Sequence, residues 1–243
     1  MVIPLAGGSP VPYTRATTVA GTLDEGTGLV AWKLRMAAKG LINRPDLMLA
    51  ATVAQDDKQE LDKLIEDAQD AAGSTHAATI GTALHALTEK LDRNEELGYV
   101  PAAYAPDLDA YLEATREFTW EHIEQFCVLD NHRIAGTPDR IATYQGKRYI
   151  FDLKTGSVDY PHKMAIQLAI YSRAVPYNIA TGERGSWGDV DQQRGIILHL
   201  PAGEGKAEIH FVDLDRGWEG LELAMQVRAW RVSKKIMTKG TNE

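Results

Sequence analysis

The chain has 243 residues, of which 44% are hydrophobic and 25% charged, values usual for a folded protein rather than a disordered or fibrous one. Its length fits one or two domains and is enough to bury a core without disulfides or structural metals. The net charge of −8 argues against a protein that coats DNA non-specifically. The one cysteine, Cys127, excludes an intramolecular disulfide and a four-cysteine zinc or iron–sulfur site.

The charge is unevenly distributed along this acidic chain. Residues 131–173 contain seven lysines and arginines against three aspartates, a local charge of +4. Such a stretch can contact a phosphate backbone, although a solvated surface is an equally good explanation. No run approaches the roughly 18 apolar residues of a membrane helix, and the first residues lack the features of a signal peptide. We therefore expect a cytoplasmic protein with no membrane partner.

The spacing of apolar residues predicts helices in the first half of the chain and mainly strands in the second. Residues 1–26, rich in Gly, Pro and Thr, are predicted to be irregular. Helices are predicted at 29–39, 45–54, 57–72, 75–91 and 107–125. Then follow strands at 126–130, 133–144 and 147–153, a helix at 160–175, strands at 194–200 and 206–214, and a helix at 215–236. This order predicts an α/β or α+β fold with a helical N-terminal part.

A tight hairpin is predicted where Gln145 and Gly146 separate two strand-like segments. That turn sets a register in which Asp139 and Asp152 face each other, with Cβ atoms about 4.5–5.5 Å apart. Like charges in this position are destabilising unless something compensates them. Lys154 lies two residues beyond Asp152 and therefore on the same face of the sheet. A divalent cation would complete the charge balance, and oxygen ligands suit Mg²⁺ or Mn²⁺ better than zinc.

Three short motifs follow one another in this region: GxxD at residues 136–139, DxK at 152–154 and QxxxY at 167–171. Together they resemble the PD-(D/E)XK nuclease superfamily, and more narrowly its RecB-type exonucleases, which include phage and CRISPR-associated members. A fourth motif, GxxxHxxxE at residues 81–89, resembles the histidine helix of the same branch. The resemblance implies a restriction-endonuclease-like αβββαβ core. We expect this core in residues 75–243, joined in one compact domain to a helical N-terminal region at 1–74.

The resemblance also implies roles for single residues. Asp139, Asp152 and Lys154 would be catalytic, with the lysine polarising the attacking water and stabilising the transition state. The metal ligands would be Asp139, Asp152, His85 and the backbone carbonyl of Leu153. The residues in supporting or DNA-binding roles would be Gly136, Gln167, Tyr171, Glu89 and Glu124.

Several of these residues also have ordinary structural explanations. His85 and Glu89 stand one turn apart and could be a simple pair on an amphipathic helix. Gln167 and Tyr171 could be a polar pair at a helix edge. Glu124, predicted at the end of the helix at 107–125, could be a solvated helix-end residue.

The function implied by the resemblance is metal-dependent hydrolysis of DNA by an exonuclease acting on ends, in recombination, repair or phage DNA processing. The expected cofactor is Mg²⁺ or Mn²⁺, without the iron–sulfur cluster of some relatives, because four cysteines are lacking. DNA is the expected partner, and a homo-oligomer is compatible with the resemblance. Two alternatives remain open: a nuclease-like DNA-binding module without cleavage activity, and another two-carboxylate enzyme such as a glycosidase.

Overall fold

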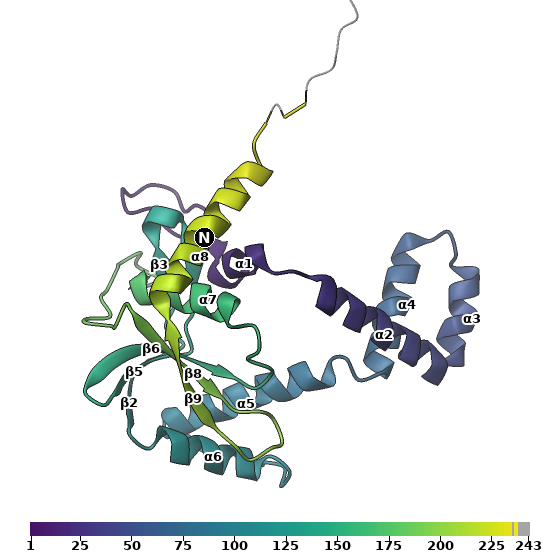
Figure 1. Cartoon of the computed structure of the whole chain (residues 1–243), viewed down its shortest axis with the longest axis horizontal. Helices are drawn as coiled ribbons and strands as arrows, with labels where there is room; N and C mark the ends of the chain where they lie inside the picture. Colours follow the sequence, from purple (N-terminus) through teal and green to yellow (C-terminus); the bar gives the residue numbers. More distant parts are fainter. Residues whose placement is uncertain (235, 238–243) are drawn as a thin grey trace, which may run out of the picture.

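The computed structural model describes residues 1–234, 236 and 237. Helices α2, α3 and α4 form an arm that extends from a body built of two sheets and the remaining helices (Figure 1). The helices are α1 Ala16–Ala20, α2 Thr27–Asn43, α3 Pro45–Val53, α4 Lys58–Ala71, α5 His76–Asp92, α6 Ala105–Thr115, α7 Pro161–Arg173 and α8 Leu214–Arg231, with 3₁₀ turns η1 Gly21–Leu23 and η2 Asp130–His132. The strands are β1 Thr14–Arg15, β2 Phe118–Ile123, β3 Cys127–Leu129, β4 Ile134–Gly136, β5 Arg140–Tyr144, β6 Lys147–Lys154, β7 Val175–Pro176, β8 Arg194–His199 and β9 Glu208–Asp213.

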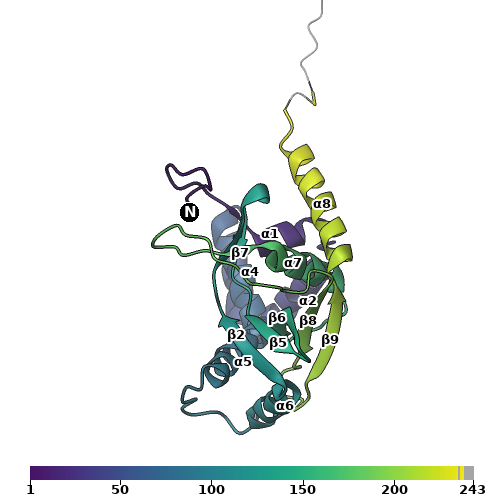
Figure 2. The same cartoon turned by 90° about the vertical axis from the view of Figure 1, so that its left-hand side faces the viewer.

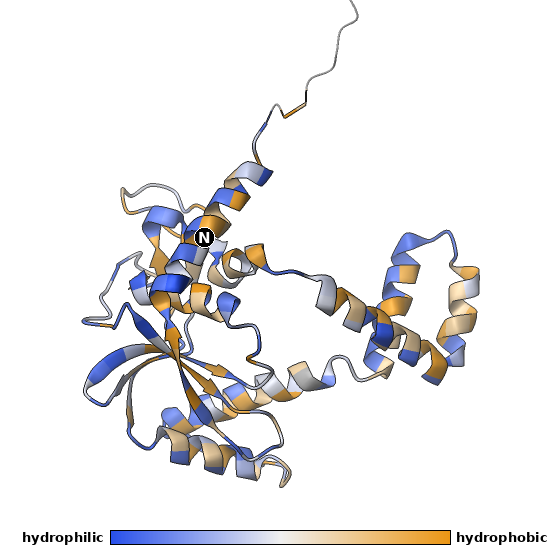
Figure 3. Cartoon of the chain, viewed as in Figure 1, coloured by the Kyte–Doolittle hydropathy of each residue, from blue (hydrophilic) through white to orange (hydrophobic). Residues whose placement is uncertain are grey.

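The larger sheet has the strand order β2-β5-β6-β8-β9. Strands β6 and β8 run parallel, joined by the crossover helix α7, and the other neighbours are antiparallel. Central strand β6 is buried on both faces from Tyr149 to Leu153, which explains why four of these five residues are hydrophobic. Helices α7 and α8 cover Ile150 and Ile197 on one face, and α6 covers Phe151 on the other through Tyr111. Figure 2 shows the strands between these helical layers, and in Figure 3 the apolar colour follows the strands and the helix sides that meet them.

The smaller sheet, β1-β4-β3-β7, lies beside the larger one. Strand β1 pairs in parallel with β4, so that Thr14 lies opposite Ile134. Helix α1 buries Ala16 and Val19 in the main core, against α7. Residues 14–20 thus pack on the body although they precede the arm. The division of the chain at residue 74 stays a proposal, and these packing contacts favour placing its first residues with the body.

The arm has a small core of its own, in which Leu47, Leu64 and Ala68 are buried. Helix α4 begins at a proper N-cap, because the Asp57 carboxylate accepts hydrogen bonds from two backbone N–H groups of the first turn. Helices α2 and α4 approach each other closely at Gly40. A Cβ atom on Gly40 would overlap the backbone carbonyl of Ala68, so this contact requires glycine.

A Gly40→Ala variant is therefore expected to loosen the arm. The methyl group must push α2 away from α4, at a cost of about 1–3 kcal/mol, and hydrogen exchange in α2–α4 should rise while exchange in the β-strands stays unchanged. Gly28→Ala is the matched control, because Gly28 lies in the same helix with open space around its Cα. If both variants gave the same exchange pattern, close packing at Gly40 would not hold the arm together.

The α/β fold with a helical N-terminal part is confirmed, with four corrections to the predicted elements. The helix predicted at 107–125 is wrong, because α6 ends at Thr115 and residues 118–123 form strand β2. The strand predicted at 133–144 is two strands, β4 and β5, which belong to different sheets. Residues 1–26 are not wholly irregular, since they contain β1, α1 and η1, and the last helix ends at Arg231 rather than near 236. The αβββαβ order is therefore made by α6, β2, β5, β6, α7 and β8.

Candidate active site

The hairpin between β5 and β6 has the predicted register, since Arg140 pairs with Phe151 and Tyr144 with Lys147. Gln145 and Gly146 both have positive φ angles, 50° and 77°, as a type I′ turn requires. Asp139 precedes the first paired residue, and its side chain crosses to β6. There its Oδ2 accepts a hydrogen bond of 2.8 Å from the backbone N–H of Leu153.

Asp152 lies in β6 and is almost fully buried. Its Oδ2 touches the Lys154 ammonium group, and its Oδ1 accepts a long hydrogen bond of 3.3 Å from Gln167. Oδ2 itself has no well-formed hydrogen bond to any residue that the structure describes. Burial, and next the charge of Asp139, raise the pKa of Asp152 to about 7. The predicted set of Asp139, Asp152 and Lys154 therefore meets in one place, which we name the carboxylate centre.

His85 reaches this centre from α5. Its Nδ1 lies 3.5 Å from Oδ2 of Asp139. Burial lowers the pKa of His85 against the opposing effect of Asp139, which favours the neutral imidazole that can bind a metal. Helix α5 comes this close because of Gly81, where a Cβ atom would lie 2.7 Å from Oγ1 of Thr155.

Gln167 and Tyr171 lie on α7, the helix that follows the hairpin. Gln167 contacts Asp152, as described, and Tyr171 is buried against Gly136. A Cβ atom on Gly136 would lie 2.7 Å from the Tyr171 hydroxyl and 2.8 Å from ring atom Cε1. The glycine of GxxD and the tyrosine of QxxxY thus pack directly against each other. This contact holds β4, the strand before Asp139, against α7.

A Gly136→Ala variant should consequently lose about 1–3 kcal/mol of folding stability, because the buried Tyr171 ring has to move. Urea denaturation measures this loss. A double variant that adds Tyr171→Val removes the ring and should tolerate the alanine, so that Gly136→Ala costs much less in that background. An equal cost in both backgrounds would mean that the ring does not require this glycine.

Glu124 is not at the end of a helix, as expected from the sequence, but directly after strand β2. Its φ angle is 51°, and its backbone N–H donates a hydrogen bond of 2.9 Å to the backbone carbonyl of Asp139. Burial, followed by the charge of Asp139, raises the pKa of Glu124 to about 7. Glu89 contributes to this shift, but its own partner is Arg93, at 3.0 Å. Glu124 is therefore hydrogen-bonded through its backbone to Asp139, whereas the side chain of Glu89 pairs with Arg93.

A buried ion pair beneath the centre was not predicted from the sequence. Arg140 donates to Asp92 at 2.7 Å, and the two side chains are 0% and 3% exposed. Asp92 also accepts hydrogen bonds from the Tyr111 hydroxyl, and Arg140 donates to Thr88. The pair ties α5, which carries His85, to the strand that follows Asp139. One signal was available, since Asp92 lies two helical turns after His85 and hence on a similar face of α5.

The basic stretch at 131–173 is mostly engaged within the protein. Five of its seven basic side chains form ion pairs: Arg140 with Asp92, Arg148 with Glu121, Lys154 with Asp152, Lys163 with Asp24 and Arg173 with Asp215. Much of this local charge therefore stabilises contacts between elements. Contact of this stretch with a phosphate backbone stays a prediction.

Two clefts are lined by neighbours of the site residues. The larger, of about 790 Å³, is lined by residues of α5 including Gly81, by Thr155 after β6 and by His199 at the end of β8. The smaller, of about 400 Å³, is lined by Gly136, Thr137 and Tyr171 together with residues near the N-terminus. Asp139, Asp152 and Lys154 themselves line neither of these two clefts.

Comparison with known proteins gives one family. The model of the PD-(D/E)XK nuclease superfamily matches residues 54–216, about two thirds of the chain, including every candidate residue from His85 to Tyr171. No curated protein matches the chain. Within the described residues, every helix is too short or too polar to span a membrane.

Proposed function

Because the chain belongs to the PD-(D/E)XK nuclease superfamily, we propose that it is a metal-dependent deoxyribonuclease that degrades DNA from its ends. The observation that carries the proposal is the meeting of Asp139, Asp152 and Lys154, in which the lysine contacts the carboxylate of the buried Asp152. Support for an exonuclease comes from the RecB-type motifs, whose His85, Gln167 and Tyr171 gather around the same centre. Roles in recombination, repair or phage DNA processing belong to the same proposal.

The residues of this centre fit a hard divalent cation. Asp139 and Asp152 offer carboxylate oxygens, His85 a neutral nitrogen, and the backbone of Leu153 lies beside the imidazole. This donor set suits Mg²⁺ or Mn²⁺, the ions that nucleases of this superfamily generally use. When bound, the cation would stabilise charge on the phosphate and make water more acidic.

The side chains around the cation site would have three further roles. The Lys154 ammonium, held by Asp152, is placed to stabilise negative charge on the reacting phosphate and to orient water. Gln167 donates a hydrogen bond to one oxygen of Asp152 and Lys154 contacts the other, so the two side chains together orient this carboxylate. The ion pair of Arg140 and Asp92 holds α5 against β5, and so keeps His85 and Asp139 in reach of each other.

The test is digestion of end-labelled linear duplex and covalently closed circular DNA with Mg²⁺, Mn²⁺ or EDTA. We expect the linear DNA to shorten from its ends with metal, the circle to persist, and EDTA to stop the reaction. Cutting of the circle would leave the chemistry standing and make the enzyme an endonuclease. DNA binding without cleavage under every metal would instead favour the non-cleaving DNA-binding module.

Cation binding should depend on pH, because Asp152 with a pKa of about 7 is largely protonated in mildly acidic solution. The cation then has to displace that proton, so its affinity should fall as the pH decreases through 7, by up to about tenfold per pH unit. Calorimetric titration with Mn²⁺ in buffers of different ionisation enthalpy measures both the affinity and the proton released. Glu124 also has a raised pKa, so a Glu124→Gln variant serves as the control. If Mn²⁺ affinity no longer depended on pH in this variant, the displaced proton would belong to Glu124 rather than to Asp152.

A further inference from the structure

We propose that His199, Glu208 and His210 form a second metal site of the transition-metal type, distinct from the carboxylate centre. We name these three residues the edge cluster, because Glu208 and His210 lie in β9, the edge strand of the larger sheet. One ligand atom from each residue lies within 4.8 Å of the others. The site goes beyond the proposed nuclease reaction, which uses none of these residues.

The geometry follows from the strand register. His199 in β8 lies directly opposite Glu208 in the antiparallel partner β9. Paired residues point to the same face of the sheet, and His210, two residues after Glu208, points there as well. Nε2 of His210 is 3.7 Å from Oε2 of Glu208, and the two imidazole rings have centroids 6.2 Å apart. Side chains thus converge from two rigid strands rather than from a mobile loop.

The chemistry of the cluster selects the ion. Two imidazole nitrogens and one carboxylate are ligands of zinc, and they suit other late divalent metals better than Mg²⁺. Within the described residues, the ion-pair partner of Glu208 is His210 rather than a lysine or arginine. The carboxylate is therefore available to a cation. Three protein ligands also leave a coordination position open, as in zinc sites that bind water or a substrate oxygen.

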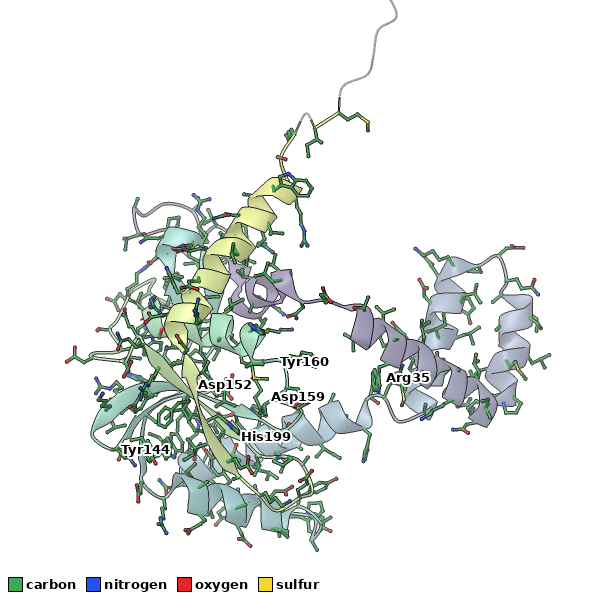
Figure 4. The ribbon with its side chains drawn as sticks, viewed as in Figure 1. Arg35, Tyr144, Asp152, Asp159, Tyr160 and His199 are labelled. Atoms are coloured by element: carbon green, nitrogen blue, oxygen red, sulfur yellow. The ribbon has the colours of Figure 1, made fainter. Side chains whose placement is uncertain are left out.

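The edge cluster begins one strand away from the carboxylate centre. Lys154 in β6 pairs with His199 in β8, so Lys154, His199 and Glu208 form one row across three strands. Neighbouring strands are about 4.8 Å apart. His199 also lines the larger cleft next to Thr155, and Figure 4 shows Asp152 and His199 near the ends of adjacent strands. Lys154 is engaged by Asp152, which reduces its repulsion of a cation at the cluster.

The test is calorimetric titration with Zn²⁺ of the full chain without an affinity tag, in an Asp139→Asn/Asp152→Asn background. This background weakens the carboxylate centre and lacks cleavage, so the result does not depend on the proposed function being right. We expect one bound Zn²⁺, which excess Mg²⁺ does not displace. Adding His210→Ala or Glu208→Gln should weaken Zn²⁺ binding at least tenfold. The control is His162→Ala, which removes an exposed histidine of α7 and should leave Zn²⁺ binding unchanged.

Circular dichroism first establishes that each variant is folded, and two different substitutions in the cluster guard against a defect peculiar to one of them. Titration with Co²⁺ gives a second readout, because its visible spectrum reports the coordination geometry and the nitrogen ligands. Equal Zn²⁺ affinity in the His210→Ala, Glu208→Gln and His162→Ala variants would overturn the proposal. So would a Zn²⁺ site that Mg²⁺ displaces.

Discussion

An Asp152→Asn variant is expected to hydrolyse DNA at least about 10³-fold more slowly than the wild type while binding DNA equally well. The amide keeps the shape of the side chain and can still contact Gln167, so the fold should be preserved. It loses the negative charge with which the buried Asp152 would bind the cation. Single-turnover cleavage of labelled DNA measures the rate, and fluorescence polarisation measures binding.

The matched control is Asp159→Asn, which removes an exposed carboxylate seven residues further along the chain. It should cleave at the wild-type rate. A companion variant, Lys154→Met, should lose about 10²–10³-fold in rate while it still binds Mn²⁺, since the lysine is not a ligand. If Asp152→Asn kept more than a tenth of the wild-type rate, the carboxylate centre would not be the site of cleavage.

The second large effect concerns stability. Asp92→Ala is expected to cost about 3–5 kcal/mol of unfolding free energy, because it leaves the guanidinium of Arg140 buried and unpaired. Burial raises the pKa of Asp92 although Arg140 lowers it, because removing the carboxylate from water carries a large desolvation penalty. Urea denaturation followed by circular dichroism measures the loss. Tyr111, which donates to Asp92, loses its partner in the same variant.

A double variant distinguishes an unpaired charge from a simple packing defect. Asp92→Leu combined with Arg140→Met replaces both ions by apolar groups and should recover most of the stability lost in Asp92→Ala. Arg44→Ala, which breaks an exposed pair with Asp46, is the surface control and should leave the urea midpoint nearly unchanged. If the double variant were as unstable as Asp92→Ala, the loss would come from altered packing rather than from the stranded arginine.

The parts of the site that sequence could predict are those set by local geometry. The type I′ turn at Gln145 and Gly146 fixes the register of the hairpin, and this register brings the side chains of Asp139, Asp152 and Lys154 together. Helical spacing likewise put Gly81 and His85 on related faces of α5. The pairing of Gly136 with Tyr171 could not be derived, because it depends on how α7 lies across the smaller sheet.

The errors have equally physical causes. The segment from Phe118 to Ile123 follows a helix without a glycine or proline to end it, so the sequence carries no signal that the helix stops at Thr115. Its alternation of Phe118 and Trp120 is the signal of a strand. Across the sheet, the Phe118 ring stacks on Tyr144, and the Trp120 ring meets Phe151 edge to face. The ion pair of Asp92 with Arg140 joins distant parts of the chain, and the helical spacing of Asp92 from His85 indicates a shared face but does not identify Arg140 as the partner.

The placement of the N-terminal strand has a consequence for the order of folding. Helices α2–α4 contact one another over short stretches of chain and can form as soon as they are synthesised. Strand β1 and helix α1 come earlier still, yet their partners are β4 and α7. Strand β1, which is synthesised before the arm, must therefore wait, unpaired, until β4 has been synthesised. The loop that its docking closes contains the whole arm, so we expect this strand to join the fold among the last elements.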